Sequence, residues 1–337
     1  MVFIFSRKED LATNAVIRWL EHLNVNYQRI NSEEDQEAIQ LLYEHLVGYS
    51  VWKGAPAKRQ EHFSLWFRRP NPGLLAGLAG KEIDTKSIRF PTFNSHSRLF
   101  ESLKNNYRHY LRNYFHHQLN YCNLGSYHKT TVNKLEVLET AVQVGLKIPE
   151  TVVTNDMEVL KPFFEKHQRD IICKTLFEAI HPLGVREEGF TIRCMTERIE
   201  DLAVLPEVFF PSLFQENIQK RFEIRVFFIR DKCYAAAMFT QQHADTITDF
   251  RNQNDQEIRT RVVPYQLDEE MEQKLRDLMR EIGINSGSID LIKGKDDNYH
   301  FLEVNPVGMY GFISTPCNYD LDEVIARELI AIGYEKN

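Results

Sequence analysis

Short strand-like segments follow one another through the second half of the chain, and this succession limits the fold more than any other feature. Apolar residues alternate with polar ones, or form brief runs, in the segments 171–176, 190–195, 208–215, 221–229, 232–239, 287–293 and 300–304. Helical spacing of apolar residues marks 268–282 and 320–332. Antiparallel strands with flanking helices are therefore expected, which is an α+β body.

The start of the chain has a different pattern. The apolar run at 2–5 is typical of a strand, residues 16–23 carry apolar side chains at helical spacing, and 25–30 reads as a second strand. Residues 62–69 alternate like a strand and end at a turn rich in Pro and Gly. A strand, helix and strand in this order predict a small parallel α/β domain. The fold class is thus α/β followed by α+β.

Composition excludes several classes of protein. The 337 residues are 43% hydrophobic and 26% charged, as in ordinary soluble globular proteins. No apolar run approaches the roughly 18 residues that a membrane span needs, and charges follow the first five residues too soon for a secretory signal. We therefore expect a cytoplasmic protein with no membrane partner. The five cysteines lie far apart without a CxxC pair, so neither disulfides nor a cysteine zinc site is expected.

Charge is divided unevenly along the chain. Residues 1–130 hold 17 Lys and Arg against 12 Asp and Glu, whereas residues 131–337 hold 24 against 36. The acidic remainder argues against a nucleic-acid partner. The basic first part suits an acidic peptide or a phosphate, and the segment 95–120 reads as a long helix with one basic face. That face is either simply solvated or binds such a ligand.

Three oxygen-bearing side chains suggest a metal site. Asp290 lies in one predicted strand, and Glu303 and Asn305 lie two residues apart in the next. Because side chains alternate along a strand, Glu303 and Asn305 share a face while Leu302 and Val304 enter the core. Two carboxylates and an amide oxygen suit Mg²⁺. The alternative is that these residues only decorate the end of a strand.

Two lysines and one arginine have contexts that suggest a role. Lys174 follows an apolar strand, where a buried ammonium is costly unless it meets an anion, and Lys134 begins a predicted helix whose apolar face holds Leu135, Leu138, Ala141 and Val142. Two converging lysines would neutralise a triphosphate, although each alone is also explained as a solvated side chain. Arg225, two residues after Glu223, either stabilises an oxyanion or forms a cross-strand ion pair.

These pieces, in this order, resemble an ATP-grasp ligase over about residues 130–310. The resemblance implies that Lys134 and Lys174 contact ATP phosphates, that residues in the hinge and the strand after it hold adenine and ribose, and that Asp290, Glu303 and Asn305 bind Mg²⁺. The hinge and strand residues concerned are Gln215, Glu216, Asn217, Ile218 and Glu223. The loop 181–189, expected to cover the phosphates, departs from the family pattern because it has only two glycines.

A narrower resemblance covers nearly the whole chain. The opening IFSRKEDLATNAVIRWL, the segment WFRRP, the stretch TDFRNQNDQEIRTRVVPYQL and the ending NPVGMYGFISTPCNYDLDEVIARELI are similar to graspetide-type ATP-grasp peptide maturases of the grasp-with-spasm group. Members phosphorylate Asp or Glu side chains of a ribosomal precursor peptide, and Thr, Ser or Lys side chains then close ω-ester or ω-amide rings. The resemblance implies a precursor peptide partner and a homodimer.

The resemblance also implies residue roles and a domain division. Catalytic roles fall to Arg225, Asp249, Arg251 and Arg193, and Glu197, Glu200 and Asp201 either contact a leader peptide or are plain surface. An N-terminal α/β pre-ATP-grasp domain is expected at 1–125, a central domain at 126–215 and a C-terminal ATP-grasp domain at 216–337. Two other functions stay open: a ligase that adds an amino acid to a peptide or protein, and a binding protein on a decayed ATP-grasp scaffold.

Overall fold

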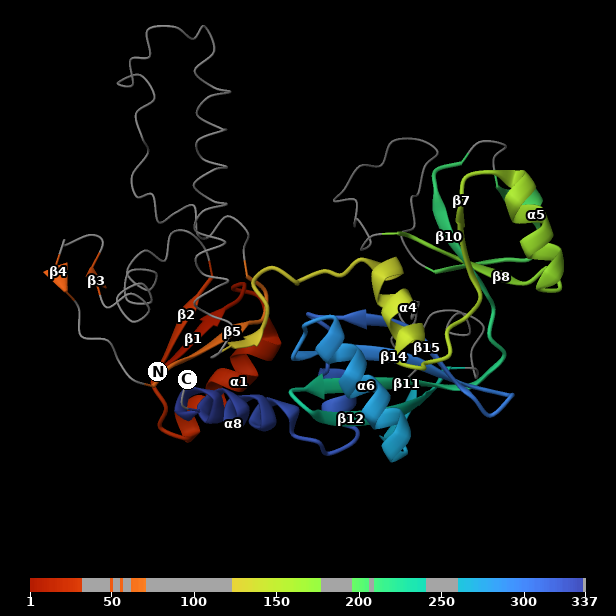
Figure 1. Cartoon of the computed structure of the whole chain (residues 1–337). Coiled ribbons are helices and arrows are strands. Elements are labelled where there is room, and N and C mark those ends of the chain that lie inside the picture. The colour runs from red at the N-terminus through yellow and green to blue at the C-terminus, as the bar shows by residue number, and fades with distance from the viewer. Residues whose placement is uncertain are drawn as a thin grey trace, which may run out of the picture. The chain divides into compact units, whose positions relative to one another are not determined.

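The structure, a computed structural model, divides the chain into two compact units (Figure 1). It describes residues 1–31, 49–50, 55–56, 62–70, 123–176, 196–205, 209–240 and 260–335. Unit 1 consists of Met1–Thr130 with Asp320–Asn337, and unit 2 is Thr131–Tyr319. The division into three segments stays a prediction, but the last residues group with unit 1 rather than with the segment that begins at 216.

Unit 1 contains a four-stranded parallel sheet in the order β2-β1-β5-β6. Its strands are β1 (Val2–Phe5), β2 (Tyr27–Ile30), β5 (Ser64–Phe67) and β6 (Asn123–Gly125). Two-residue strands β3 (Tyr49–Ser50) and β4 (Ala55–Pro56) form a separate pair. The predicted parallel α/β opening is confirmed, because β1 and β2 pair in parallel across the helix that joins them.

Two helices of unit 1 pack together and contact the parallel sheet. They are α1 (Leu11–His22) and α8 (Leu321–Tyr334), which lie side by side in Figure 1 although they come from opposite ends of the chain. Helix α1 buries Thr13, Val16 and Leu20, which recur at helical spacing. All four residues of β1 are buried, as expected for a strand of a parallel sheet.

The larger sheet of unit 2 has five antiparallel strands in the order β13-β12-β11-β14-β15. They are β11 (Lys220–Ile229), β12 (Lys232–Phe239), β13 (Arg261–Tyr265), β14 (Ser286–Gly294) and β15 (Tyr299–Asn305). The short helix α7 (Gly311–Ser314) follows β15. The antiparallel body predicted from alternation is confirmed.

Helices α4 (Lys134–Gln143) and α6 (Glu269–Glu281) cover one face of this sheet and share its apolar core (Figure 1). Helix α4 contributes Val137, Leu138 and Ala141. The prediction that Leu135 and Val142 lie on the buried face is wrong, since they are 37% and 54% exposed. At 100° per residue both side chains point roughly 100° away from the centre of the buried stripe.

The smaller sheet of unit 2 has the order β7-β10-β8-β9 and packs against α5 (Met157–Lys166). Its strands are β7 (Thr151–Thr154), β8 (Ile171–Lys174), β9 (Glu197–Ile199) and β10 (Ser212–Glu216), and the 3₁₀ helix η2 (Leu202–Val204) follows β9. The predicted strand at 190–195, the loop 181–189 and the helix at 95–120 lie outside the described residues.

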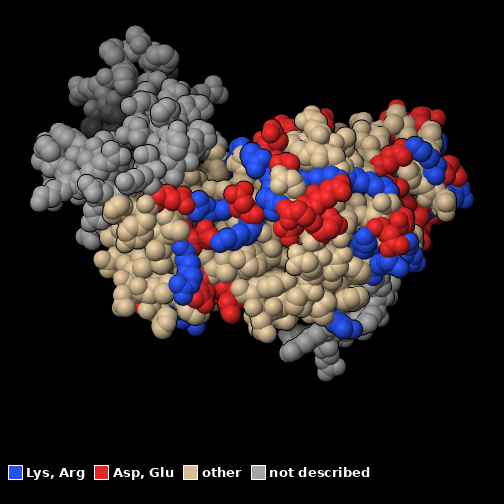
Figure 2. All heavy atoms as spheres, turned by 60° about the horizontal axis from the view of Figure 1, so that its bottom comes forward, with Lys and Arg blue, Asp and Glu red and all other residues tan. Residues whose placement is uncertain are grey.

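Helices of the described part of the chain are too short or too polar to cross a bilayer. On the face displayed in Figure 2, Lys and Arg side chains lie next to Asp and Glu side chains. The described residues also form surface ion pairs, such as Lys161 with Glu158 and Lys274 with Glu270. Such pairs contribute little to stability, roughly 0–1 kcal/mol each.

Candidate active site

A row of charged side chains crosses three neighbouring strands of the five-stranded sheet. Arg225 of β11 lies opposite Asp290 of β14, which lies opposite Glu303 of β15. Directly paired residues share a face of a sheet. The alternate residues, including Ile224 and Ile289, belong to the apolar core beneath α4 and α6. The charged row therefore lies on the face turned away from those helices.

Arg225 and Asp290 form a largely buried ion pair. One guanidinium nitrogen, Nη1, donates to both carboxylate oxygens of Asp290 at 2.7 Å, and the side chains are only 6% and 15% exposed. Nη2 donates to the carbonyl oxygen of Met309 at 3.2 Å, and the guanidinium lies 5.5 Å from the ring centre of Phe312. Removing either partner would leave a buried charge, which costs several kcal/mol.

Lys134 completes the row at its other end. This lysine is the first residue of α4, whose N-cap Asn133 accepts a hydrogen bond from Leu135 N at 3.0 Å. Its Nζ lies 3.9 Å from Glu303 Oε2. Two carboxylates placed directly opposite each other on adjacent strands repel. The row therefore reads positive, negative, negative, positive, with a cation on each side of the two acids.

Asn305 lies two residues after Glu303 in β15, and therefore on the same face of the sheet. It pairs with Ser288 of β14. Its Oδ1 accepts a hydrogen bond from Val307 N at 3.1 Å, which shapes the loop after β15. Gly308 in that loop approaches so closely that an added Cβ would lie 2.4 Å from Ser288 Oγ. The structure thus brings all three predicted metal ligands to one face of two adjacent strands.

A β-bulge sets which residues of β15 face the core. Asp290 pairs with Glu303 and Leu291 pairs with Phe301, so Leu302 is an extra residue. Phe301 and Val304 are buried in the core, whereas Leu302 is only half-buried. The prediction that Leu302 enters the core is therefore wrong, because the bulge interrupts the alternation on which it relied. Val304 is buried as predicted.

The donor set fits Mg²⁺ by its chemistry. A carboxylate has about four lone-pair sites, so the contacts of Asp290 with Arg225 leave room for a metal. Glu303 and the amide of Asn305 add further oxygens of the kind that Mg²⁺ prefers. The described residues contain no group of three or more His, Cys, Asp or Glu placed to hold a metal, so a site here depends on the amide as its third ligand.

Lys174 ends β8 and is half-buried. It pairs with Leu213 of β10 and shares its face of the small sheet, while Cys173 packs on the opposite face against the core around α5. Lys134 Nζ donates to the carbonyl oxygen of Thr175, the residue after Lys174, at 3.0 Å. The start of α4 and the end of β8 therefore lie next to each other, as convergence of the two lysines requires.

The hinge residues are engaged with neighbouring strands and turns. Gln215 is buried and its Nε2 donates to Thr151 Oγ1 at 2.9 Å. Glu216 Oε1 accepts from the backbone of Glu150 at 3.0 Å, and Asn217 Nδ2 donates to Asp170 Oδ1 at 2.9 Å. The half-buried Ile218 follows them. These contacts fix the path of the chain between the two sheets.

Glu223 lies on the face of the charged row, two residues before Arg225. It is 8% exposed, forms an ion pair with Lys220 and accepts a hydrogen bond from Thr240 Oγ1 at 3.2 Å. Sequence reasoning missed Lys220 and Thr240. The pairing of β11 shifts register just after Lys220. Strict alternation along the strand therefore does not predict that Lys220 and Glu223 contact each other.

Several predicted residues are not tested by the geometry. Arg193, Asp249 and Arg251 lie outside the described part of the chain. Glu197, Glu200 and Asp201 are exposed; Glu200 pairs with Arg198 at 3.1 Å, and Asp201 Oδ1 accepts from Ala203 N at 2.9 Å.

Comparison with known proteins gives whole-chain structural likenesses. No protein-family model matches the sequence, and no curated protein matches it. The macrocyclase MdnC from Microcystis aeruginosa MRC, solved with its precursor peptide MdnA, is 24% identical with a TM-score of 0.66, and the match covers 98% of this chain and 99% of MdnC. At this identity the likeness shows the fold.

Two further solved structures have the same fold. A RiPP-associated ATP-grasp ligase from Chryseobacterium gregarium, in complex with ADP and with a leader and core peptide, is 21% identical with a TM-score of 0.68 over 100% of this chain and 98% of that one. The ATP-grasp ligase PsnB, complexed with a phosphomimetic variant of its minimal precursor, Mg and ADP, is 17% identical with a TM-score of 0.65 over 98% of both chains.

Proposed function

We propose, from the ATP-grasp fold that these likenesses establish, that this chain is an ATP-dependent ligase which forms side-chain macrocycles in a ribosomally made precursor peptide. The observation that carries the proposal is the row of Arg225, Asp290, Glu303 and Lys134 across three strands, with Asn305 beside it. Support also comes from the whole-chain likeness to a macrocyclase and to ligases solved with precursor peptides.

The row suits a polyanionic nucleotide with its metal. Asp290, Glu303 and Asn305 would hold Mg²⁺, which when bound neutralises phosphate oxygens and polarises the phosphorus that is attacked. Lys134 and Lys174 would contact the phosphates. The hinge residues Gln215, Glu216, Asn217 and Ile218, with Glu223, would hold adenine and ribose.

The reaction that follows is a two-step condensation. A carboxylate oxygen of a peptide Asp or Glu attacks the γ-phosphorus of ATP, the bond to the β-phosphate oxygen breaks, and ADP leaves. A Thr or Ser hydroxyl, or a Lys amine, of the same peptide then attacks the acyl carbon and loses its proton, and phosphate leaves. The products are a ring, ADP and phosphate, and the peptide loses the elements of one water.

Arg225 is placed to serve this chemistry by fixing Asp290. Its Nη1 contacts both oxygens of that carboxylate, and its Nη2 bonds to the Met309 carbonyl, so the guanidinium is held at two points. We infer that Arg225 stabilises charge on the phosphate or acyl oxygens as it develops. Arg193, Asp249 and Arg251 would orient the acceptor or the carboxylate.

The test is incubation with ATP, Mg²⁺ and a synthetic peptide rich in Thr, Asp and Glu, followed by mass spectrometry. Loss of one water per ring with release of ADP supports the proposal. A mass gain from an added amino acid would instead indicate a ligase of another product class. Hydrolysis without a mass change, or no ATP consumption with any acidic peptide, would contradict the macrocyclase assignment.

A matched pair of lysine variants connects the reaction to the row. Lys134→Ala removes the cation beside Glu303, and we expect ATP turnover to fall on the order of 10²-fold. Lys161→Ala removes an exposed lysine of α5 that pairs with Glu158 and should retain the wild-type rate. Equal rates in both variants would place the nucleotide elsewhere.

A further inference from the structure

The parallel sheet of unit 1 has a topological switch point between β1 and β5. From β1 the chain passes through α1 to β2 on one side of β1, whereas β5 pairs with the other side. The strand that follows β5 among the described residues of this sheet is β6, which lies on the far side of β5 from β1. Ligands of open α/β sheets bind in the crevice at such a point, outside the carboxyl ends of the strands.

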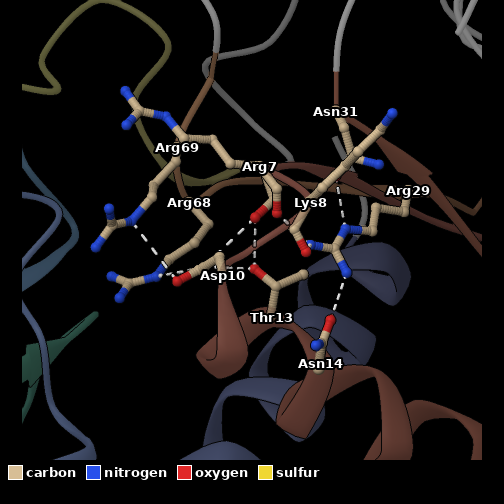
Figure 3. A network of polar contacts seen from close by, with 10 residues as sticks. Arg7, Lys8, Asp10, Thr13, Asn14, Arg29, Asn31, Arg68 and Arg69 are labelled. Atoms are coloured by element: carbon tan, nitrogen blue, oxygen red, sulfur yellow. Dashed lines mark hydrogen bonds and ion pairs between the residues drawn. The ribbon is translucent and has the colours of Figure 1, made fainter.

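Basic side chains gather at this edge of the sheet (Figure 3). Arg7 and Lys8 follow β1, Arg68 and Arg69 follow β5, and Arg29 lies near the end of β2. We call these five residues the switch-point cluster. The acidic residues in the same segments are Glu9 and Asp10. Among the described residues of these segments, cations therefore exceed acids.

Asp10 contacts two arginines of the cluster. Its Oδ2 accepts from Thr13 Oγ1 at 2.6 Å and from Arg68 Nε at 3.3 Å, and its Oδ1 lies 3.6 Å from Arg69 Nε. Burial alone would raise the pKa of Asp10, but Arg68, Thr13 and Arg69 together hold it below its usual value. The carboxylate is therefore ionised at neutral pH and orients the two arginines.

Asp10 is also the N-cap residue of α1, yet it makes no side-chain cap hydrogen bond. Its carboxylate is turned to Thr13 and the arginines (Figure 3), so the first backbone N–H groups of this 12-residue helix have no side-chain acceptor from the cap residue. Such N–H groups and the helix dipole favour an anion. The buried Nε of Arg69 has Asp10 Oδ1 as its ion-pair partner at 3.6 Å, which is beyond hydrogen-bond distance.

Arg29 holds the backbone of the segment between β1 and α1 in place through hydrogen bonds. Its guanidinium donates to the backbone carbonyl of Arg7 and to that of Lys8, and its Nε donates to Asn31 Oδ1 at 2.7 Å. The backbone that carries Arg7 and Lys8 is thus tied to β2, while these two residues are exposed. A site with a held backbone and exposed cations is preorganised for an incoming anion.

We propose that the switch-point cluster binds side-chain carboxylates of the acidic peptide substrate. This inference rests on the proposed function, which supplies a substrate with Asp and Glu residues. Arginine matches a carboxylate in a planar, two-bonded arrangement, and Asp10 between Arg68 and Arg69 already shows that these side chains orient toward a carboxylate. Cations at the ends of two neighbouring strands suit several carboxylates along an extended peptide better than one phosphate.

The test is direct binding of a fluorescently labelled synthetic peptide of alternating Thr and Glu, measured by anisotropy without ATP. Arg69→Gln should weaken binding about tenfold, and the double variant Arg7→Gln/Lys8→Gln, which changes only exposed side chains, should do the same. Arg18→Gln is the matched control, because it removes one exposed charge of α1 in the same unit and should bind like the wild type.

Three outcomes of the binding assay would overturn the inference. They are wild-type affinity in both cluster variants, equal binding of a Thr and Gln peptide, and displacement of the peptide by inorganic phosphate at the peptide's own concentration, which would assign the cluster to a small oxyanion. The proposed function fails separately. It is contradicted if the wild type binds the peptide but never modifies it with ATP, while the inference is contradicted if modification proceeds with an unchanged KM for peptide in the cluster variants.

Discussion

The five-stranded sheet of unit 2 carries charges across the middle of three strands, whereas the parallel sheet of unit 1 carries them at the ends of its strands. In the first, Arg225 and Lys134 flank Asp290 and Glu303, so the two signs balance. In the second, cations outnumber acids among the described residues at the strand ends, where the switch-point cluster lies. A balanced row with two facing carboxylates suits a metal and its phosphates, and an excess of cations suits an anion with no metal.

The difference follows from sheet geometry. In an antiparallel sheet, residues in register place side chains of three strands in one line, so Arg225, Asp290 and Glu303 meet at mid-strand. In a parallel sheet the carboxyl ends of all strands meet at one edge, and charges that follow the strands gather there. The two sites therefore respond differently when an acid is removed.

The largest expected effect is the loss of Glu303. In Glu303→Ala the proposed metal site keeps one carboxylate and Lys134 loses its ion-pair partner, so ATP turnover with peptide should fall on the order of 10³-fold. Initial rates over a range of Mg²⁺ concentrations measure this. The control is Glu158→Ala, which removes an exposed acid of α5. A rate close to that of the wild type in Glu303→Ala would show that the row does not serve the reaction.

The second prediction concerns the bulge that places Glu303 opposite Asp290. Phe301→Ala should lower the free energy of unfolding by about 3 kcal/mol, because Phe301 is a buried core residue. Leu302→Ala should cost only about 1 kcal/mol, since Leu302 is the half-buried extra residue. Denaturant unfolding of the two variants measures the difference. The reverse order would mean that β15 keeps a regular alternation.

The third prediction removes an acid from unit 1. Asp10→Asn should lower the free energy of unfolding at pH 7 by about 1–2 kcal/mol, because the ion pairs with Arg68 and Arg69 are lost. It should also strengthen binding of the acidic peptide, since the cluster gains a net positive charge. Removing an acid would thus lower ATP turnover in unit 2 but strengthen peptide binding in unit 1. Weaker peptide binding in a folded Asp10→Asn would contradict the inference.

The pH dependence of the same variant has a defined sign. The pKa of Asp10 is lower in the folded protein than in the unfolded chain, so its stabilisation is complete above the unfolded pKa, near 4, and is lost as the pH falls through the folded value. The stability difference between wild type and Asp10→Asn should be constant from pH 7 to about 5 and shrink below about pH 4. A difference that grows on acidification would contradict this.

Much of the fold was predictable because it depends on local alternation. The parallel opening, the antiparallel body and the helices α6 and α8 follow from apolar spacing, and the fold of the whole chain matches the ATP-grasp expectation. The packing of α8 in unit 1 was not predictable, because an amphipathic pattern shows that a helix has a buried face but does not show what covers it.

The sequence predicted which residues form the candidate site, but not which of their side chains contact one another. The sequence indicated that Asp290, Glu303 and Asn305 belong together, but strand register decides that Arg225 pairs with Asp290. Lys134 reaches Glu303 from a distant helix, and one extra residue at Leu302 changes the alternation. The roles of Arg193, Asp249 and Arg251, the homodimer and the domain boundaries stay predictions.

The smallest expected effect concerns Cys173, which precedes Lys174. Burial and, to a smaller extent, the Glu197 carboxylate raise the pKa of this thiol to about 11, although a side-chain hydrogen bond with Ser212 acts in the opposite direction. The thiol is therefore protonated at pH 8, and it packs on the face of β8 opposite Lys174. Cys173→Ser should change ATP turnover less than about twofold.

Alkylation supplies a second readout for the same residue. Cys173 should resist iodoacetamide at pH 8 in the native protein and react after unfolding, as mass spectrometry of the peptide that contains it would show. Rapid native labelling together with loss of turnover would place the thiol on the same face as Lys174. Slow labelling with full turnover would agree with a buried thiol on the face of β8 opposite Lys174.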